Sequence, residues 1–316
     1  MRRYIVLLIG LMAFAVARAQ FDPQMGQYMF LQSAYNPAAV GDGDLMRVAG
    51  MHRMQFVDIT NAPMTTWFSF SSAFRLGKTE HGAGIRFMND RYGLFTNQAL
   101  YAQYAYRQKL GKGHLSIGID AGFVNVGFKG DSVNLSKMGD EYHDASDAAI
   151  PAGSKSGMKF DLGAGIYYST NNWWVGGSYS HITRPVVEWD DQSDVKLIGT
   201  MYIAGGYSHR LKNHKDWELM PSAIVMSDFR SWDVNLTFLT EYKDRYRWGL
   251  GYRIMGSVNI LLGMDIISGL EIGYTCELPT NKLLLESYGS HELYLAYGFD
   301  ILKPRRNNKY KSVRYL

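Results

Sequence analysis

Hydrophobic and polar residues alternate along much of this chain with a period of two. In the stretch 246–254, the even positions carry Tyr, Trp, Leu, Tyr and Ile, whereas the odd positions carry Arg, Gly, Gly and Arg. The stretches 160–168, 270–278 and 293–301 alternate in the same way. Because successive side chains of a β-strand point to opposite sides, each stretch is predicted to be a strand with one apolar face and one polar or small face.

The length of these segments favours a transmembrane barrel over a soluble sandwich. They run for about ten to thirteen residues, which is long for a soluble sheet and suits a strand tilted across a membrane. Aromatic residues such as Trp173, Trp232 and Tyr246 lie near segment ends, where a barrel meets the membrane interfaces. In lipid every backbone N–H and C=O must be paired within the protein, so the strands are expected to close on themselves. We therefore predict an all-β fold, a transmembrane antiparallel β-barrel of about fourteen strands. The predicted strands are 47–56, 64–74, 81–90, 95–107, 113–127, 158–170, 172–183, 197–209, 216–227, 231–243, 245–255, 257–266, 269–278 and 290–302.

The lengths of the connections predict an orientation. The three longest, 128–157, 184–196 and 279–289, all follow odd-numbered strands, and the intervening turns are short. In outer-membrane barrels the long loops are extracellular and the short turns periplasmic. With an even number of strands, this parity places both termini in the periplasm of a bacterium.

The inward face of the predicted barrel is polar. A barrel of this size is wider than one that side chains alone can fill, so its lumen is expected to be wet or plugged by a peptide segment. The candidate plugs are the pre-barrel segment 20–46 and the loop 128–157. The predicted inward charges are Arg86, Asp120, Arg247, Arg253, Asp265 and Asp300.

The N-terminus has the pattern of a secretory signal peptide. Arg2 and Arg3 precede a short apolar run, and Ala17-Arg18-Ala19 matches a small-residue cleavage site. We therefore predict four regions, which are the signal peptide 1–19, a periplasmic or plug-like segment 20–46, the barrel 47–302 and a basic periplasmic tail 303–316. The tail holds six basic residues and no acidic residue, and either a solvated tail or docking to an acidic partner or the cell wall explains this composition.

Catalytic and cofactor motifs are not found in the sequence. There is no G-x-S-x-G, P-loop or H-E-x-x-H pattern. A His–Ser pair on the barrel wall, such as His114 with Ser116, would suit a lipid hydrolase, but such pairs arise by chance. Acidic residues cluster in 140–147 and 188–194 without the spacing of a calcium loop, which favours solvated loops. We predict no catalytic, cofactor or metal site, and the mild net charge of +4 argues against a nucleic-acid partner.

The segment 21–41 is the most distinctive part of the sequence. It reads Phe-Asp-Pro-Gln-Met-Gly-Gln-Tyr-Met-Phe-Leu-Gln-Ser-Ala-Tyr-Asn-Pro-Ala-Ala-Val-Gly, which resembles the D-P-Q-x-x-x-Y-M-F-N-Q-x-x-Y-N-P-A-x-x-G-like opening of the PorP/SprF family. The stretches 53–65 and 82–93 are also similar to that family. Leu31 stands where the family often has Asn, and Met54 lies where an aromatic-rich element is usual.

This resemblance implies an outer-membrane component of the type IX secretion system of Bacteroidetes, which is also linked to gliding motility. The resemblance implies a non-enzymatic protein whose partners are a PorK/PorN-like periplasmic lipoprotein ring, the translocon and the C-terminal sorting domains of cargo. Two alternatives remain, a channel for a small solute or lipid and a barrel enzyme. The matching opening residues also have a simpler explanation, which is that they fold the periplasmic mouth of the barrel. The candidate partner-binding residues are Asp22, Pro23, Gln24, Tyr28, Met29, Phe30, Tyr35, Asn36 and Pro37, together with Arg305, Arg306, Lys309, Lys311 and Arg314 of the tail.

Overall fold

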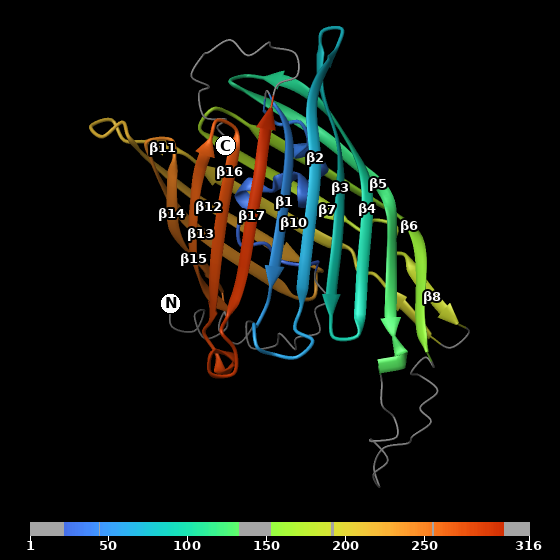
Figure 1. The fold of residues 1–316 in the computed structure, drawn as a ribbon. Coiled ribbons are helices and arrows are strands. Elements are labelled where there is room, and N and C mark those ends of the chain that lie inside the picture. The colour runs from blue at the N-terminus through green and yellow to red at the C-terminus, as the bar shows by residue number, and fades with distance from the viewer. Residues whose placement is uncertain (1–21, 44, 133–152, 191–192, 255, 300–316) are drawn as a thin grey trace, which may run out of the picture.

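The computed structural model describes residues 22–43, 45–132, 153–190, 193–254 and 256–299, and the predicted signal peptide and basic tail lie outside them. Fourteen antiparallel strands form a closed barrel, which confirms the predicted fold class and strand number (Figure 1). Every predicted strand is present, with small shifts at the ends. The barrel strands are β1 (Met46–Met54), β2 (Met64–Leu76), β3 (Thr79–Tyr92), β4 (Phe95–Leu110), β5 (Gly113–Lys129), β6 (Ser154–Ser169), β7 (Trp173–Ser180), β10 (Thr200–Tyr207), β12 (Trp217–Ser227), β13 (Trp232–Tyr242), β14 (Tyr246–Arg253), β15 (Ser257–Ile267), β16 (Leu270–Pro279) and β17 (Ser290–Phe299).

Two pairings close the sheet, one between the first and last strands and one between strands that are neighbours along the chain. β1 pairs with β17, with Met46 opposite Phe299, and β10 pairs with β12, with Met201 opposite Ser227. The short β11 (His209–Arg210) continues the line of β10 and also pairs with β12. Because β1 begins and β17 ends at the same end of the barrel, we call this the terminal end and the opposite one the far end.

The two faces of the wall differ as the alternation predicts. Outward residues of neighbouring strands are large and apolar, and Phe238, Leu250 and Leu262 are 51%, 61% and 53% exposed. Inward residues between them are polar and buried, as are Asn259 and Glu271. This outer surface matches the apolar band by which a barrel contacts lipid.

The connection 184–196 contains structure that the alternation did not predict. β8 (Val186–Asp190) and β9 (Ser193–Lys196) form a separate two-stranded hairpin. β7 also ends earlier than predicted, because His181 and Arg184 adopt left-handed backbone conformations with φ of 54° and 45°. These conformations are sterically disfavoured within a strand, so the chain turns away there. Two single-turn helices, η3 (Gly130–Ser132) and η5 (Lys282–Leu285), lie in other far-end loops.

At the far end of β4–β6 the inner face of the wall is apolar and the outer face is polar, which is the opposite of the rest of the barrel. On the inner side, Trp189 of the hairpin packs against Phe95 and Phe128, with ring centroids 6.1 and 5.7 Å apart, and its Nε1 donates to the carbonyl of Val126. On the outer side, polar residues pair across strands, as where Gln98 donates to Asn89. An apolar inner face with a polar outer face is the arrangement of water-exposed sheets, so these strand ends extend beyond the lipid-facing band.

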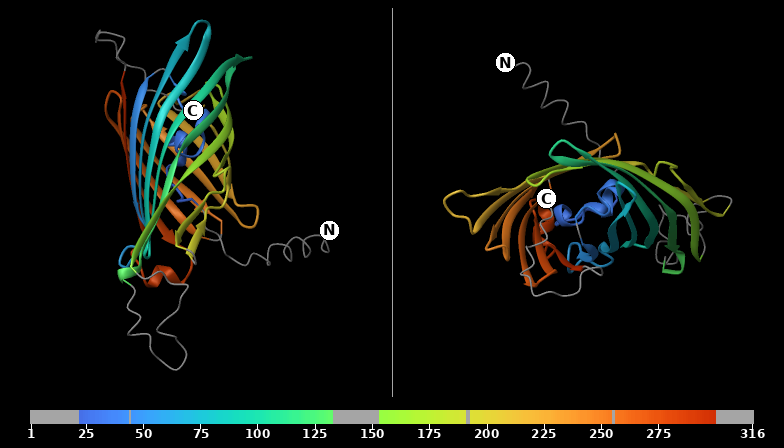
Figure 2. Two further views of the ribbon diagram at one scale, coloured as in Figure 1. Left: turned by 90° about the vertical axis from the view of Figure 1, so that its right-hand side faces the viewer. Right: turned by 90° about the horizontal axis from the view of Figure 1, so that it is seen from above.

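The chain that precedes β1 lies inside the barrel, as the view along the axis shows (Figure 2). It contains three short turns, η1 (Tyr28–Phe30), α2 (Gln32–Tyr35) and η2 (Pro37–Ala39). None of the helices in the described parts of the chain has the length and apolar character needed to cross a membrane.

Candidate functional site in the barrel lumen

The N-terminal segment, defined here as residues 22–43, folds through local capping rather than through a long helix. Asn36 is the clearest case, because its side-chain Oδ1 accepts a hydrogen bond from the backbone N–H of Ala38 at 2.9 Å. Pro37 then occupies the first position of η2, where the fixed φ of proline suits a helical turn. The Asn-Pro pair therefore sets the bend that turns the segment toward the wall.

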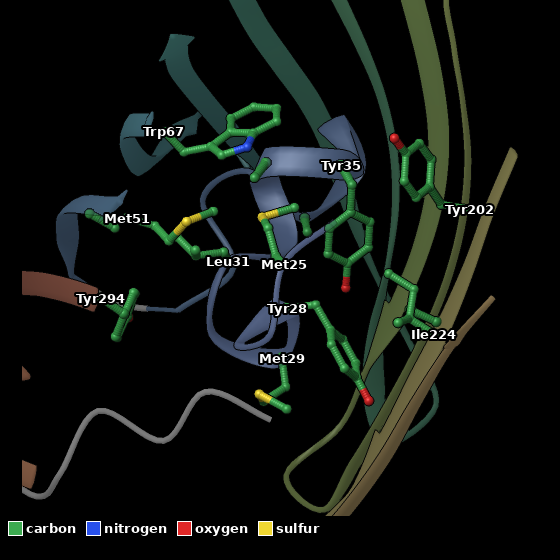
Figure 3. Close-up of a cluster of buried hydrophobic side chains, with 14 of the residues drawn as sticks. Met25, Tyr28, Met29, Leu31, Tyr35, Met51, Trp67, Tyr202, Ile224 and Tyr294 are labelled. Atoms are coloured by element: carbon green, nitrogen blue, oxygen red, sulfur yellow. The ribbon is translucent and has the colours of Figure 1, made fainter. Parts of the chain in front are cut away.

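A buried apolar cluster joins the N-terminal segment to the wall around it. Tyr28, Leu31 and Tyr35 are at most 5% exposed, and they face side chains from the wall that include Trp67 and Tyr202 (Figure 3). The rings of Tyr35 and Tyr202 lie 5.6 Å apart. Because these residues are buried inside a polar lumen, the segment supplies much of the apolar surface that fills the barrel.

One side of the lumen is lined by glycines on β3, β5, β6 and β7, which we call the glycine wall. A Cβ on Gly82 would lie 1.9 Å from the carbonyl oxygen of Val40, and one on Gly118 would lie 2.4 Å from the backbone nitrogen of Ala38. A Cβ on Gly165 would lie 2.1 Å from the side chain of Asn36. Only glycine lets the backbone of the segment approach the wall so closely. The glycines of this wall are Gly82, Gly84, Gly118, Gly165 and Gly176.

The opposite side, the inner face of β12–β17, holds the segment with polar side chains, and we call it the polar wall. Glu292 of β17 accepts hydrogen bonds from the backbone N–H groups of Gly26 at 2.7 Å and of Gln27 at 2.9 Å. The Nε2 of Gln24 donates to Asp233 at 2.5 Å. The two bonds to Glu292 satisfy backbone donors that would otherwise be buried without a partner.

Arginines and carboxylates form clusters of ion pairs on the polar wall and on β1. Glu271 binds both Arg47, at 3.2 Å, and Arg247, at 3.4 Å. Glu277 contacts Arg53 and also Arg253, the latter at 2.6 Å. Charges are costly to bury unless they are paired, so these ion pairs explain how the lumen holds buried ionised groups.

The polar wall also carries buried polar atoms without a partner among the described residues. Both side-chain atoms of Asn235 and of Asn259 are in this state, as are the hydroxyls of Thr237 and Thr275. A small cavity between the segment and the wall is lined by residues that include Tyr28 and Asn235. Buried polar groups in proteins bind water when no protein partner is present. The interface with the polar wall is therefore expected to be hydrated, unlike the close contact with the glycine wall.

The first described residue of the segment is held by a histidine at the far end of β7. His181 Nε2 lies 3.0 Å from Asp22, and its Nδ1 lies 2.6 Å from Asp161. Tyr202 donates to the other oxygen of Asp22 at 2.6 Å. Burial alone would lower the pKa of His181, but the charges and hydrogen bonds of Asp22 and Asp161 raise this pKa to about 10. The imidazole is therefore protonated at neutral pH and attracts both carboxylates.

Near the terminal end, Glu218, Glu241 and Asp244 are the one group among the described residues whose carboxylates are spaced closely enough to hold a metal ion. Arg210 lies against this group, binding Glu218 at 2.7 Å and also contacting Asp244. The guanidinium supplies the positive charge that the carboxylates require, so the cluster is an ion-pair site.

The family described as type IX secretion system membrane protein PorP/SprF matches residues 17–297. The chain belongs to the PorP/SprF family. The match covers the N-terminal segment and almost the whole barrel, and with the fold it supports an outer-membrane location.

Solved structures with a similar arrangement of strands are outer-membrane barrels with little sequence in common with this PorP/SprF protein. The Pseudomonas putida toluene transporter TodX is 10% identical, with a TM-score of 0.44, over 84% of this chain and 92% of TodX. The translocator domain of the Neisseria meningitidis autotransporter NalP is 11% identical, with a TM-score of 0.41, over 82% and 90% of the two chains. The comparison with curated proteins found no match.

The candidate residues that come from the opening of this PorP/SprF sequence all lie inside the barrel. Tyr28, Met29, Tyr35 and Asn36 are buried against the wall, and the side chain of Phe30 lies below the Arg247 guanidinium at 4.7 Å. The candidate residues of the tail, Arg305, Arg306, Lys309, Lys311 and Arg314, lie outside the described residues.

The segment runs along the lumen from the far half to the terminal end. Asp22 contacts His181 at the far end of β7, whereas Asp42 binds Arg107, near the terminal end of β4, at 2.8 Å. The first described residue and the last residue of β17, Phe299, therefore lie toward opposite ends of this PorP/SprF barrel.

Sequence reasoning missed several of the wall residues that hold the segment. Glu292, His181 and the five glycines of the glycine wall were not among the candidates. A signal for the glycines was present, because Gly82 and Gly84 both fall on the inward face of one predicted strand, where a small residue leaves room for backbone. No local pattern could have linked Glu292 to Gly26, which lies 266 residues away in the chain.

Proposed function

We propose that this protein is a non-enzymatic scaffold of the type IX secretion machinery. In this role it links PorK/PorN-like periplasmic ring subunits and the translocon to the export or surface attachment of cargo. The observation that carries the proposal is the N-terminal segment, which occupies the lumen between the glycine wall and the polar wall. A barrel filled by its own chain suits a scaffold better than an open channel for solutes. Membership of a type IX secretion family supplies the machinery in which this scaffold works.

The proposed orientation places the terminal end in the periplasm. Its support is the loop pattern, because the long connections after β5, β7 and β16 all lie at the far end. In outer-membrane barrels the longer loops are extracellular. Periplasmic ring subunits would then meet the short turns of the terminal end and the basic tail that follows β17.

The partner-binding role of the opening residues remains part of this proposal. Because Tyr28, Met29 and Tyr35 are buried, a partner would reach them only after the segment had left the lumen. The simpler role, that they fold and fill the barrel, predicts that variants in the segment reduce the amount of assembled barrel. The partner role predicts normal assembly with weaker co-purification of ring subunits.

Deletion of the gene tests the proposed function. We expect cargo to accumulate inside the cells and export to return when the wild-type gene is restored. Normal cargo secretion with lost uptake of a solute would overturn the proposal and favour the channel alternative. Removal of 303–316 provides a narrower test, in which barrel assembly should persist while pull-down of periplasmic partners falls. Unchanged pull-down would remove the tail from the proposal.

A further inference from the structure

The charges of the connecting segments differ between the two ends of the barrel. Among the described residues, the terminal-end turns together with the short β11 carry seven basic and two acidic residues, whereas the far-end loops, apart from the β8–β9 hairpin, carry three basic and four acidic ones. An excess of basic residues at one end of a membrane protein attracts anionic groups to that surface. The terminal-end charges are Lys78, Lys112, Arg210, Lys212, Lys215, Lys243 and Arg245, with Asp216 and Asp244.

Four of these cations lie on two neighbouring turns. Lys212 and Lys215 are exposed on the hairpin that joins β11 to β12, and Lys243 and Arg245 lie in the turn between β13 and β14. The backbone N–H of Lys243 donates to the carbonyl of Asp216 at 2.7 Å, which fixes one turn against the other. None of the four cations forms an ion pair within 4.0 Å with a described carboxylate, because Asp244 is bound by Arg210 and only Asp216 adds an exposed negative charge.

Aromatic rings lie directly below these cations on the outer face of β12–β14. The ring of Trp217 is 4.9 Å from that of Tyr242 and 5.6 Å from that of Trp248, which is 39% exposed. The Nζ of Lys243 lies 5.1 Å from the centre of the Tyr242 ring, and the Cζ of Arg245 lies 5.4 Å from that of Tyr246. Aromatic residues at the edge of a lipid-facing band occupy the membrane interface, and basic residues beside them reach the level of the lipid phosphates.

The position of the β11–β12 hairpin favours a membrane lipid as its partner over a protein that docks on the mouth of the barrel. Seen along the axis, the β11–β12 hairpin extends sideways beyond the barrel wall rather than over the opening (Figure 2). A surface beyond the wall at the terminal end lies above the surrounding lipid leaflet, and the apolar residues Phe238 and Leu250 continue the same strands into the lipid-facing band. An acidic protein that docks on the mouth of the barrel would instead require basic residues around the opening.

We infer that the turns 211–216 and 243–245, together with the rings of Trp217 and Trp248, bind an anionic glycerophospholipid of the adjacent leaflet. The four cations contact the phosphate and the charged headgroup, and the upper part of an acyl chain lies against the two indole rings. This site depends on the barrel and its membrane location, and it is independent of any role in secretion.

The test uses the purified full chain in phosphatidylcholine vesicles that contain a trace of spin-labelled phosphatidylglycerol or spin-labelled phosphatidylcholine. We expect wild-type protein to associate with phosphatidylglycerol about fivefold more strongly at low salt, and this preference should fall as salt screens the charges. The variant with Lys212→Gln, Lys215→Gln, Lys243→Gln and Arg245→Gln should lose the preference. A matched variant with Lys78→Gln, Lys112→Gln, Arg184→Gln and Arg230→Gln removes the same charge elsewhere and should keep most of it.

Three results would overturn the inference. These are equal association of the two lipids with wild-type protein, equal loss of preference in both variants, and displacement of phosphatidylglycerol by polyglutamate, which would point to an acidic protein partner.

The shift of the folded barrel on unboiled gels checks that each variant is assembled. If the quadruple variant fails to assemble, the pairs Lys212→Gln with Lys215→Gln and Lys243→Gln with Arg245→Gln are tested separately, and each should lower the preference. Failure of this assay would leave the secretion role intact, and failure of the gene-deletion experiment would leave the lipid site intact.

Discussion

The two walls of the lumen hold the same segment by different physical means. At the glycine wall, backbone meets backbone, and the absent Cβ of Gly82 leaves the space that Val40 occupies. At the polar wall, Glu292 and Asp233 bind residues 24–27 through side chains, and the side chains of the nearby Asn235 and Asn259 have no hydrogen-bond partner in the described part of the chain. Close-packed contacts tolerate little added volume, whereas hydrated polar contacts can exchange partners with water. We therefore expect residues 36–41 to be the fixed part of the segment and residues 22–30 to be the part that detaches more readily.

The largest effect is expected for Gly82→Ala, which breaks the fixed part. The new Cβ would overlap the Val40 carbonyl, and because the obstacle is backbone on both sides the cost is expected to be about 3 kcal/mol. Limited proteolysis should show the whole segment cleaved in the variant and protected in wild type. Gly177→Ala is the matched control, because its Cβ would meet only the Tyr202 carbonyl at an ordinary 3.8 Å. Equal protection of the segment in both variants would contradict the account of the glycine wall.

A smaller and more local effect is expected for Glu292→Gln at the polar wall. The variant weakens the charge-assisted hydrogen bonds from Gly26 and Gln27, at a cost of about 1.5–3 kcal/mol, while Arg53 keeps Glu277 as a partner. Proteolysis should then cut within 22–30 and leave 36–41 protected. Glu286→Gln, on the exposed loop before β17, is the control and should behave as wild type. Release of the complete segment by Glu292→Gln would show that the two walls do not act separately.

The smallest effect is expected from pH at His181. Its pKa of about 10 lies above the usual value of about 6.5, so the contact with Asp22 and Asp161 stabilises the folded state fully below about pH 6.5. This stabilisation is lost as pH rises through about 10. Cleavage of residues 22–30 by subtilisin, which is active in alkaline solution, should therefore increase between about pH 8 and pH 10.5. In His181→Gln the increase should disappear, and an unchanged profile in that variant would exclude His181 as its cause.

The barrel could be predicted from the sequence because its determinants are local. Alternation along a strand such as β14 reports directly which face meets lipid, and the fourteen predicted strands are confirmed. The β8–β9 hairpin was missed because it lies outside the lipid-facing band. Val187 is buried and Trp189 packs on Phe128 in a small aromatic cluster at the far end.

The lumen could be predicted only in part. The chain showed that inward faces such as that of Arg247 would be charged, but it did not show which groups would pair. The contacts of Asp22 with His181 and of Gly26 with Glu292 join residues far apart in sequence, and they exist only once the barrel has closed. The glycine wall depends in the same way on strands that meet only in the folded barrel.

The central claim is that the N-terminal segment fills the lumen, and conductance of the purified protein in a planar lipid bilayer tests it most directly. The account predicts no steady large conductance for the wild type, and a measurable conductance in Gly82→Ala, where the fixed part of the segment is displaced. A steady large conductance of the wild-type barrel would contradict the account.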